Sequence, residues 1–134
     1  MSLKYRLIPK INPQNPEQPP KFFPVPITKN ELRLRQLAEQ SAQISTVSVV
    51  DTIAVIESLL QLIPQHLSQG ELVRLGDFGS FAIGIRSEGA QQQEQFKSAM
   101  IKGLKIYFRP GKEFKKALDN VEFEKERENA AQEP

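Results

Sequence analysis

Residues of the types that act in catalysis or metal binding are few in this chain, and their spacing is unfavourable. The 134 residues include no cysteine and a single histidine, His66, which excludes a thiol nucleophile, a disulfide and a site with several histidine ligands. Asp51 and Glu57, in a predicted helix, do not share a face well enough for paired acid and base work. The glycines of residues 75–81 lack the strand-to-helix context of a dinucleotide loop and are expected to be turn positions. We therefore expect no enzyme activity, cofactor or metal site.

Positive charge is concentrated in one stretch of the chain. Residues 86–116 contain eight basic and three acidic residues, a net charge of +5, whereas the whole chain carries +2. Residues 120–134 carry −3 and mask this excess in the total. Such a stretch can be an ordinary solvated face or the electrostatic footprint of an anionic partner.

The basic stretch coincides with a predicted hairpin. Residues 71–81 read as short strands and the residues from 106 to Pro110 as the return strand, and Gly76 and Gly79 allow backbone turns that a side chain would obstruct. Pro110 and the glycine after it end the second strand, and a short basic helix is predicted to follow. The position of the basic residues on the polar arm of this hairpin favours a binding surface over a solvated face.

Two helices are predicted before the hairpin. Residues 28–31, Thr-Lys-Asn-Glu, have the form of a capping box and predict a helix over residues 29–40. A longer helix is predicted to begin at Ser45, Thr46 or Ser48, to kink or restart near Pro64 and to end at Gly70. The apolar residues of this second helix form two stripes: Val49, Ile53, Ile56, Leu60, Ile63 and Leu67, and Val55, Leu59 and Leu62. Because this surface exceeds what one side of a small domain buries, we expect contact with another subunit.

The segments outside residues 28–118 differ in composition from this domain. Residues 1–27 contain two strand-like stretches, 4–8 and 22–27, separated by a proline-rich segment, and are expected to be edge strands or polyproline-like cover that packs on the domain. The PxxP spacing at residues 16–19 leaves a ligand for a proline-recognition domain as an alternative. Residues 119–134 are predicted to be an acidic, disordered tail. No apolar run of 18 residues or cleavable signal pattern is present, and a cytoplasmic protein is expected.

The order of these elements resembles the bacterial HU and integration host factor family of histone-like DNA-binding proteins. The resemblance covers residues 28–118 and is most specific at residues 76–81 and 109–112. It implies an α+β fold with two N-terminal helices, a three-stranded antiparallel sheet with a hairpin arm, and a short C-terminal helix. It also implies an intertwined homodimer whose arms reach around double-stranded DNA into the minor groove. The N-terminal extension is similar to that of extended HU-like proteins of Bacteroidetes.

This resemblance implies sequence-tolerant binding of double-stranded DNA by a nucleoid-associated architectural protein, with no small-molecule substrate and no membrane partner. The expected DNA-binding residues, which would contact phosphates, are Arg86, Lys97, Lys102, Lys105, Arg109, Lys112, Lys115 and Lys116. In that family a proline at the tip of the arm wedges between base pairs, but residues 86–109 contain no proline. We therefore expect weak DNA bending.

A protein-interaction or assembly module is the alternative function. In this alternative an HU-like dimer has weak or no DNA binding and uses its arm or its proline-rich extension to contact a protein. The modest net charge, the missing proline, and Glu88 and Glu94 on the arm favour it.

Overall fold

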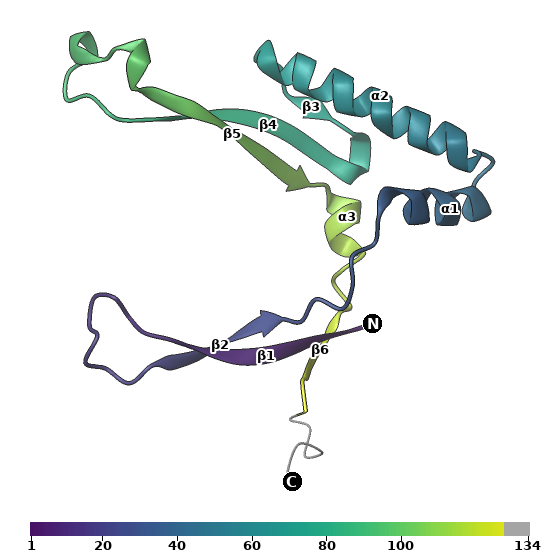
Figure 1. Cartoon of the computed structure of the whole chain (residues 1–134), viewed down its shortest axis with the longest axis horizontal. Coiled ribbons are helices and arrows are strands. Elements are labelled where there is room, and N and C mark those ends of the chain that lie inside the picture. The colour runs from purple at the N-terminus through teal and green to yellow at the C-terminus, as the bar shows by residue number, and fades with distance from the viewer. Residues whose placement is uncertain (128–134) are drawn as a thin grey trace. The chain divides into compact units, whose positions relative to one another are not determined.

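The computed structural model describes residues 1–127, which form two compact units (Figure 1). The first unit combines Met1–Glu31 with the chain from Leu118 onward, and the second unit is Leu32–Ala117. Each unit contains a three-stranded sheet, and the α-helices of the described residues all lie in the second unit. The α+β class predicted from the sequence is confirmed.

A pair of helices opens the second unit. Helix α1 is Leu34–Ile44 and helix α2 is Val49–Ser68. Ser48 precedes α2, and its Oγ accepts a hydrogen bond from the Asp51 N–H at 3.1 Å, so Ser48 is the N-cap among the three predicted candidates.

The predicted start of α1 is wrong. The helix begins after Arg33, whose N–H donates to Gln36 Oε1 at 2.9 Å, and the capping-box sequence at residues 28–31 caps nothing. Just before that sequence, the Ile27 N–H donates to the Lys4 carbonyl at 2.9 Å. This bond ties the chain to the sheet of the first unit, so it is still extended where the capping box would need it to turn.

Helix α2 is continuous through Pro64, so the predicted restart near Ile63 is wrong. Pro64 has no N–H to donate to the Leu60 carbonyl four residues earlier, so the helix continues without this one bond. The predicted end at Gly70 is confirmed: Gly70 has φ 84°, and its N–H donates to the Leu67 carbonyl at 3.0 Å.

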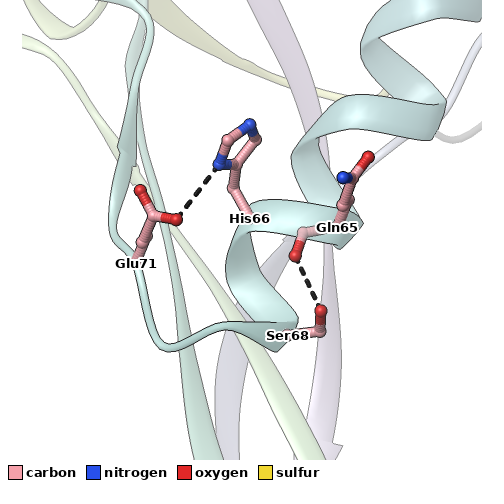
Figure 2. Close-up of polar contacts among 4 residues, drawn as sticks. All are labelled: Gln65, His66, Ser68 and Glu71. Carbon is pink, nitrogen blue, oxygen red and sulfur yellow. Dashed lines mark hydrogen bonds and ion pairs between the residues drawn. The ribbon is translucent and has the colours of Figure 1, made fainter.

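His66 lies at this end of α2 (Figure 2). Its Nδ1 is 3.2 Å from Oε1 of Glu71, and the Ser68 hydroxyl donates to the Gln65 carbonyl at 2.6 Å. The Glu71 N–H also donates to the His66 carbonyl at 3.1 Å. These contacts hold the turn between α2 and the sheet, and His66 is exposed in the last turn of α2.

The second unit continues as a sheet with a long hairpin. Its strands are β3 (Val73–Arg74), β4 (Gly79–Ser87) and β5 (Ile101–Pro110), in the antiparallel order β3-β4-β5. Figure 1 shows β4 and β5 extending together to a tip away from α1. The short helix α3 (Lys112–Lys116) follows. The predicted hairpin and C-terminal helix are therefore present.

The two segments that carry the family resemblance meet at the base of this hairpin. Gly76 and Gly79 have positive φ values of 51° and 148°, which shape the turn between β3 and β4. The Gly111 N–H donates to the Phe78 carbonyl at 3.0 Å. The predicted role of the glycines as turn positions is confirmed, since a strand follows them where a dinucleotide loop would require a helix.

The second unit has a small core. Phe78, Phe81, Phe108 and Phe114 form an aromatic cluster with ring centroids 5.1–6.1 Å apart. Among the described large apolar residues and alanines, only Ala38 and Leu67 are buried. Much of the apolar surface of α2 and of the hairpin is thus uncovered within one chain.

The first unit is a sheet of three strands in the order β2-β1-β6. Strand β1 (Ser2–Lys10) pairs antiparallel with β2 (Lys21–Pro26) and parallel with β6 (Glu122–Lys125). Both strand-like stretches predicted in residues 1–27 are strands, but β1 is central where an edge position was expected. Pro9 is tolerated because β6 pairs only with Ser2–Tyr5, so β1 has an open edge beside Pro9.

The predicted disorder of the acidic tail is wrong for residues 122–125, which form β6. The Glu122 N–H donates to the Met1 carbonyl at 2.9 Å and the Glu126 N–H to the Tyr5 carbonyl at 2.8 Å. Backbone bonds therefore order this segment despite its charge. The rest of the predicted tail, residues 128–134, lies outside the described residues, and the packing of residues 1–27 on the domain stays a prediction.

Candidate nucleic-acid interface

The register of the β4–β5 hairpin sorts its side chains by face. Residues directly opposite each other on antiparallel strands share a face, and the faces alternate along each strand. One face carries Phe81, Ile83 and Ile85 of β4 opposite Phe108, Ile106 and Leu104 of β5. The other face carries Ser80, Ala82, Gly84 and Arg86 opposite Arg109, Tyr107, Lys105 and Gly103. The hairpin thus has one apolar face and one face on which all the charged side chains are basic, which we call the basic face of the hairpin.

Glycines leave room for long side chains on the basic face. A Cβ at Gly103 would lie 3.4 Å from Nη2 of Arg86, so the guanidinium lies across Gly103. A Cβ at Gly84 would lie 2.7 Å from Cε2 of Tyr107, so the tyrosine ring covers Gly84. Lys105 lies directly opposite Gly84 and is exposed. The face therefore offers cations and an aromatic ring on a flat backbone surface.

Arg74 joins this face, although the sequence analysis did not select it. Ser80 on β4 lies between Arg74 on β3 and Arg109 on β5 in the register, so all three share one face. Arg74, Asp77, Arg109 and Lys112 line a hollow of about 300 Å³. Three cations and one carboxylate give this hollow a net positive charge, which suits a phosphate group.

The cations of the basic face are not neutralised by ion pairs within the described residues. The ion pairs of lysine and arginine in residues 1–127 join Arg35 to Glu39 and Lys102 to Glu88, at 3.6 and 3.3 Å. None of them includes Arg74, Arg86, Lys105, Arg109 or Lys112. Within residues 1–127, no ion pair therefore competes with an anionic partner for these cations.

The structure brings together four of the eight predicted DNA-binding residues. Arg86, Lys105 and Arg109 share the basic face, and Lys112 meets Arg109 at the hollow. The other four lie apart: Lys97 before the turn Ser98–Met100 near the tip, Lys102 in its ion pair with Glu88, and Lys115 and Lys116 in the last turn of α3. The DNA-binding role of all eight stays a prediction.

Other kinds of site find little support in residues 1–127. They contain no group of three or more histidine, cysteine or acidic residues that could hold a metal ion. None of the helices there combines the length and apolar character needed to cross a membrane.

Residues 1–125 match the family described as "HU domain fused to wHTH, Ig, or Glycine-rich motif". The chain belongs to this family. The HU and integration host factor resemblance drawn from residues 76–81 and 109–112 is thereby confirmed. The basic face of the hairpin includes parts of both segments that carry this resemblance, since Ser80 and Arg109 lie opposite each other on it.

One protein sequence and one solved structure are similar to this chain. It is 30% identical over 95 residues to integration host factor subunit beta of Colwellia psychrerythraea, across 69% of this chain and 96% of that protein. A crystal structure of a candidate bacterial DNA-binding protein from Bacteroides vulgatus has a TM-score of 0.65 at 17% identity. That match covers 94% of this chain and 49% of the other, so this chain spans about half of the solved protein's length. The second likeness shows the shared fold.

Proposed function

We propose that this HU-family chain binds double-stranded DNA with little sequence preference and acts as an architectural protein of the bacterial nucleoid, in the cytoplasm. The observation that carries the proposal is the strand register, which places Arg74, Arg109, Lys105 and Arg86 on one face of the sheet. Basic side chains on a flat sheet face reach phosphates, and phosphate contacts fix position without reading bases. The action is binding, with no catalytic step.

A homodimer is part of this proposal. Ile85, Leu104 and Ile106 on the apolar face of the hairpin are 64%, 62% and 73% exposed, and Leu60 on α2 is 68% exposed. Large contiguous apolar surfaces of this kind are typical of protein interfaces. A second copy would cover them, and the two basic faces of the hairpins would then engage one duplex together.

The proposal is tested by titrating DNA binding against salt. The parent chain should bind unrelated random duplexes equally, and log K should fall linearly with log salt. The variant in which Arg86, Lys105, Arg109 and Lys112 are all replaced by alanine should have a slope shallower by about 0.9 for each phosphate that is no longer neutralised. The matched control replaces Arg33, Arg35, Lys29 and Lys125 by alanine, which removes the same charge from outside the basic face of the hairpin.

A protein-interaction module is the second candidate function, favoured by the ion pair between Lys102 and Glu88. This pair, at 3.3 Å, neutralises a cation close to the arm tip, where a DNA clasp would use positive charge. If the parent chain has no affinity for duplexes at low salt, or if the quadruple variant binds like the parent, this candidate replaces DNA binding.

A further inference from the structure

The sheet of the first unit also sorts its side chains by face. Along β1, Ser2, Lys4, Arg6, Ile8 and Lys10 alternate with Leu3, Tyr5, Leu7 and Pro9. Across from them on β2, Lys21, Phe23 and Val25 share the face of Lys10, Ile8 and Arg6, whereas Phe22, Pro24 and Pro26 share the other. We call the face that holds Lys4, Arg6, Lys10 and Lys21 the basic face of the first sheet.

Two contacts agree with this assignment of faces. Lys10 Nζ lies 5.5 Å from the centre of the Phe23 ring, which places both side chains on one side of the sheet. The Ser2 hydroxyl donates to Oε2 of Glu124 at 3.4 Å. The acidic residues of β6 therefore lie beside the Ser2 end of β1, and the other end of the basic face is left to cations.

Lys10 and Lys21 lie directly opposite each other at that other end. Together with Phe23, Asn12 and Gln18 they line a hollow of about 330 Å³ beside the β1–β2 connection. Lysines and side-chain amides around a hollow are groups that contact phosphates and sugars in complexes with DNA.

The charge of this surface is strong and unpaired within the described residues. Residues 1–31 contain five basic and two acidic residues. The ion pairs of residues 1–127 include none of Lys4, Arg6, Lys10 and Lys21. Glu122 and Glu124 share this face opposite Ser2 and Lys4, which leaves Arg6, Lys10 and Lys21 as its cations away from the carboxylates.

We propose that the basic face of the first sheet is a second surface for double-stranded DNA, with Arg6, Lys10 and Lys21 contacting its phosphates. Arg6 and Lys10 are four residues apart on one strand, about 13 Å at the rise of an extended chain. A duplex carries about one negative charge per 1.7 Å of its axis. A face of this length therefore meets several phosphates at once, and it extends the DNA contact beyond the hairpin. This inference rests on the proposed DNA-binding function.

An anionic lipid bilayer is the competing partner for a basic surface, but the first sheet is poorly built for it. A membrane-bound element inserts exposed apolar side chains and keeps its cations at the same interface. Here the most exposed aromatic side chains of the sheet, Phe22 and Phe123 at 64% and 73%, are on the face opposite to Lys10 and Lys21. A flat bilayer meets only one face, so DNA fits the arrangement better.

The first test compares two charge-matched variants of the full chain. Lys10→Gln and Lys21→Gln together should make the salt dependence of duplex binding shallower by about 0.9 for each phosphate that is no longer neutralised. The control variant, Lys29→Gln with Lys125→Gln, removes the same charge from the same unit. Neither residue is on the basic face of the first sheet, because Lys29 lies outside the strands and Lys125 is on the opposite face. This control should keep the parent slope. Equal slopes for the two variants would overturn the proposal.

The second test uses the unmodified parent chain and so does not depend on how variants fold. The extent of acetylation of each lysine is measured by mass spectrometry with and without saturating duplex. Bound DNA should lower the acetylation of Lys10 and Lys21 and leave that of Lys29 and Lys125 unchanged. Absence of protection at Lys10 and Lys21 while Lys105 is protected would overturn the second surface and leave hairpin binding standing. Vesicles of phosphatidylserine that bind the parent but not the Lys10 and Lys21 variant, with DNA binding unchanged, would overturn it in favour of a membrane.

Discussion

Arg74 and Arg109 flank Ser80 on one face of the sheet, one from β3 and one from β5. This arrangement concentrates positive charge at the base of the hairpin, beside the turn formed by the family motifs. Asp77 is close to both in the hollow and leaves a net positive charge there. The base of the hairpin, as well as its arm, is therefore equipped to hold a phosphate.

We expect Arg74→Ala to weaken DNA binding. Removal of one phosphate-binding cation should make the slope of log K against log salt shallower by about 0.9. The effect should be the same for unrelated duplexes, as measured by fluorescence anisotropy across a salt series. Arg35→Ala is the control, because Arg35 is on α1 and pairs with Glu39. A slope for Arg74→Ala equal to that of the control would remove Arg74 from the interface.

Gly79→Ala should destabilise the second unit. Gly79 has φ 148°, and a Cβ there would lie 2.7 Å from Cε2 of Phe108 and 2.5 Å from the Arg109 carbonyl oxygen. Backbone strain and overpacking together should lower the free energy of unfolding by about 2 kcal/mol or more. Gly89→Ala is the matched control, since a Cβ there meets nothing within 4 Å. Equal urea midpoints for the two variants would show that the turn tolerates a side chain.

Local signals predicted much of the second unit because its elements are set by nearby residues. Ser48 caps α2 through a bond to Asp51, and Gly70 ends it in a left-handed conformation. The hairpin was predicted from its apolar residues and glycines, and the Gly111 bond to the Phe78 carbonyl joins its two ends.

The features that the sequence did not predict depend on bonds between distant residues. Strand β6 has charged residues on both sides of Phe123, and its backbone bonds to β1 order it. The capping box at residues 28–31 is overridden because Ile27 is bonded to Lys4. Arg74 lies outside the basic stretch of the sequence, and only the register brings it to Arg109. An isolated arginine between Val73 and Leu75 was the one available signal.

Ile56→Asp should abolish the proposed homodimer. Ile56 is 42% exposed in the single chain, within the apolar surface of α2. Burying an unpaired carboxylate in an interface should cost on the order of several kcal/mol of association free energy. Sedimentation velocity at micromolar concentration should show a dimer for the parent and a monomer for the variant. Gln61→Asp adds the same charge at an exposed polar position of α2, and this control should stay dimeric. A parent chain that sediments as a monomer would contradict the dimer.

DNA bound by this protein should be bent only weakly. The tip of the hairpin, residues 88–100, contains no proline, and smooth bending of a 20–30 base-pair site by 40–90° costs on the order of 1–6 kcal/mol. Without a wedge that opens a base step, phosphate contacts must offset this whole cost, so the bound duplex should stay near its free shape.

The bend is measured by fluorescence energy transfer between two dyes, one at each end of a duplex. The duplex should have about 30 base pairs, the length to which the bending cost above applies. The transfer efficiency should change little on binding. Phe96 is the exposed aromatic residue near the tip, at 43%, and aromatic side chains can wedge between base pairs. A large increase in transfer that Phe96→Ala removes, while binding persists, would contradict weak bending and would identify Phe96 as the wedge. An increase that survives in Phe96→Ala would contradict it as well, and would assign the bend to the basic faces that draw the duplex around the protein.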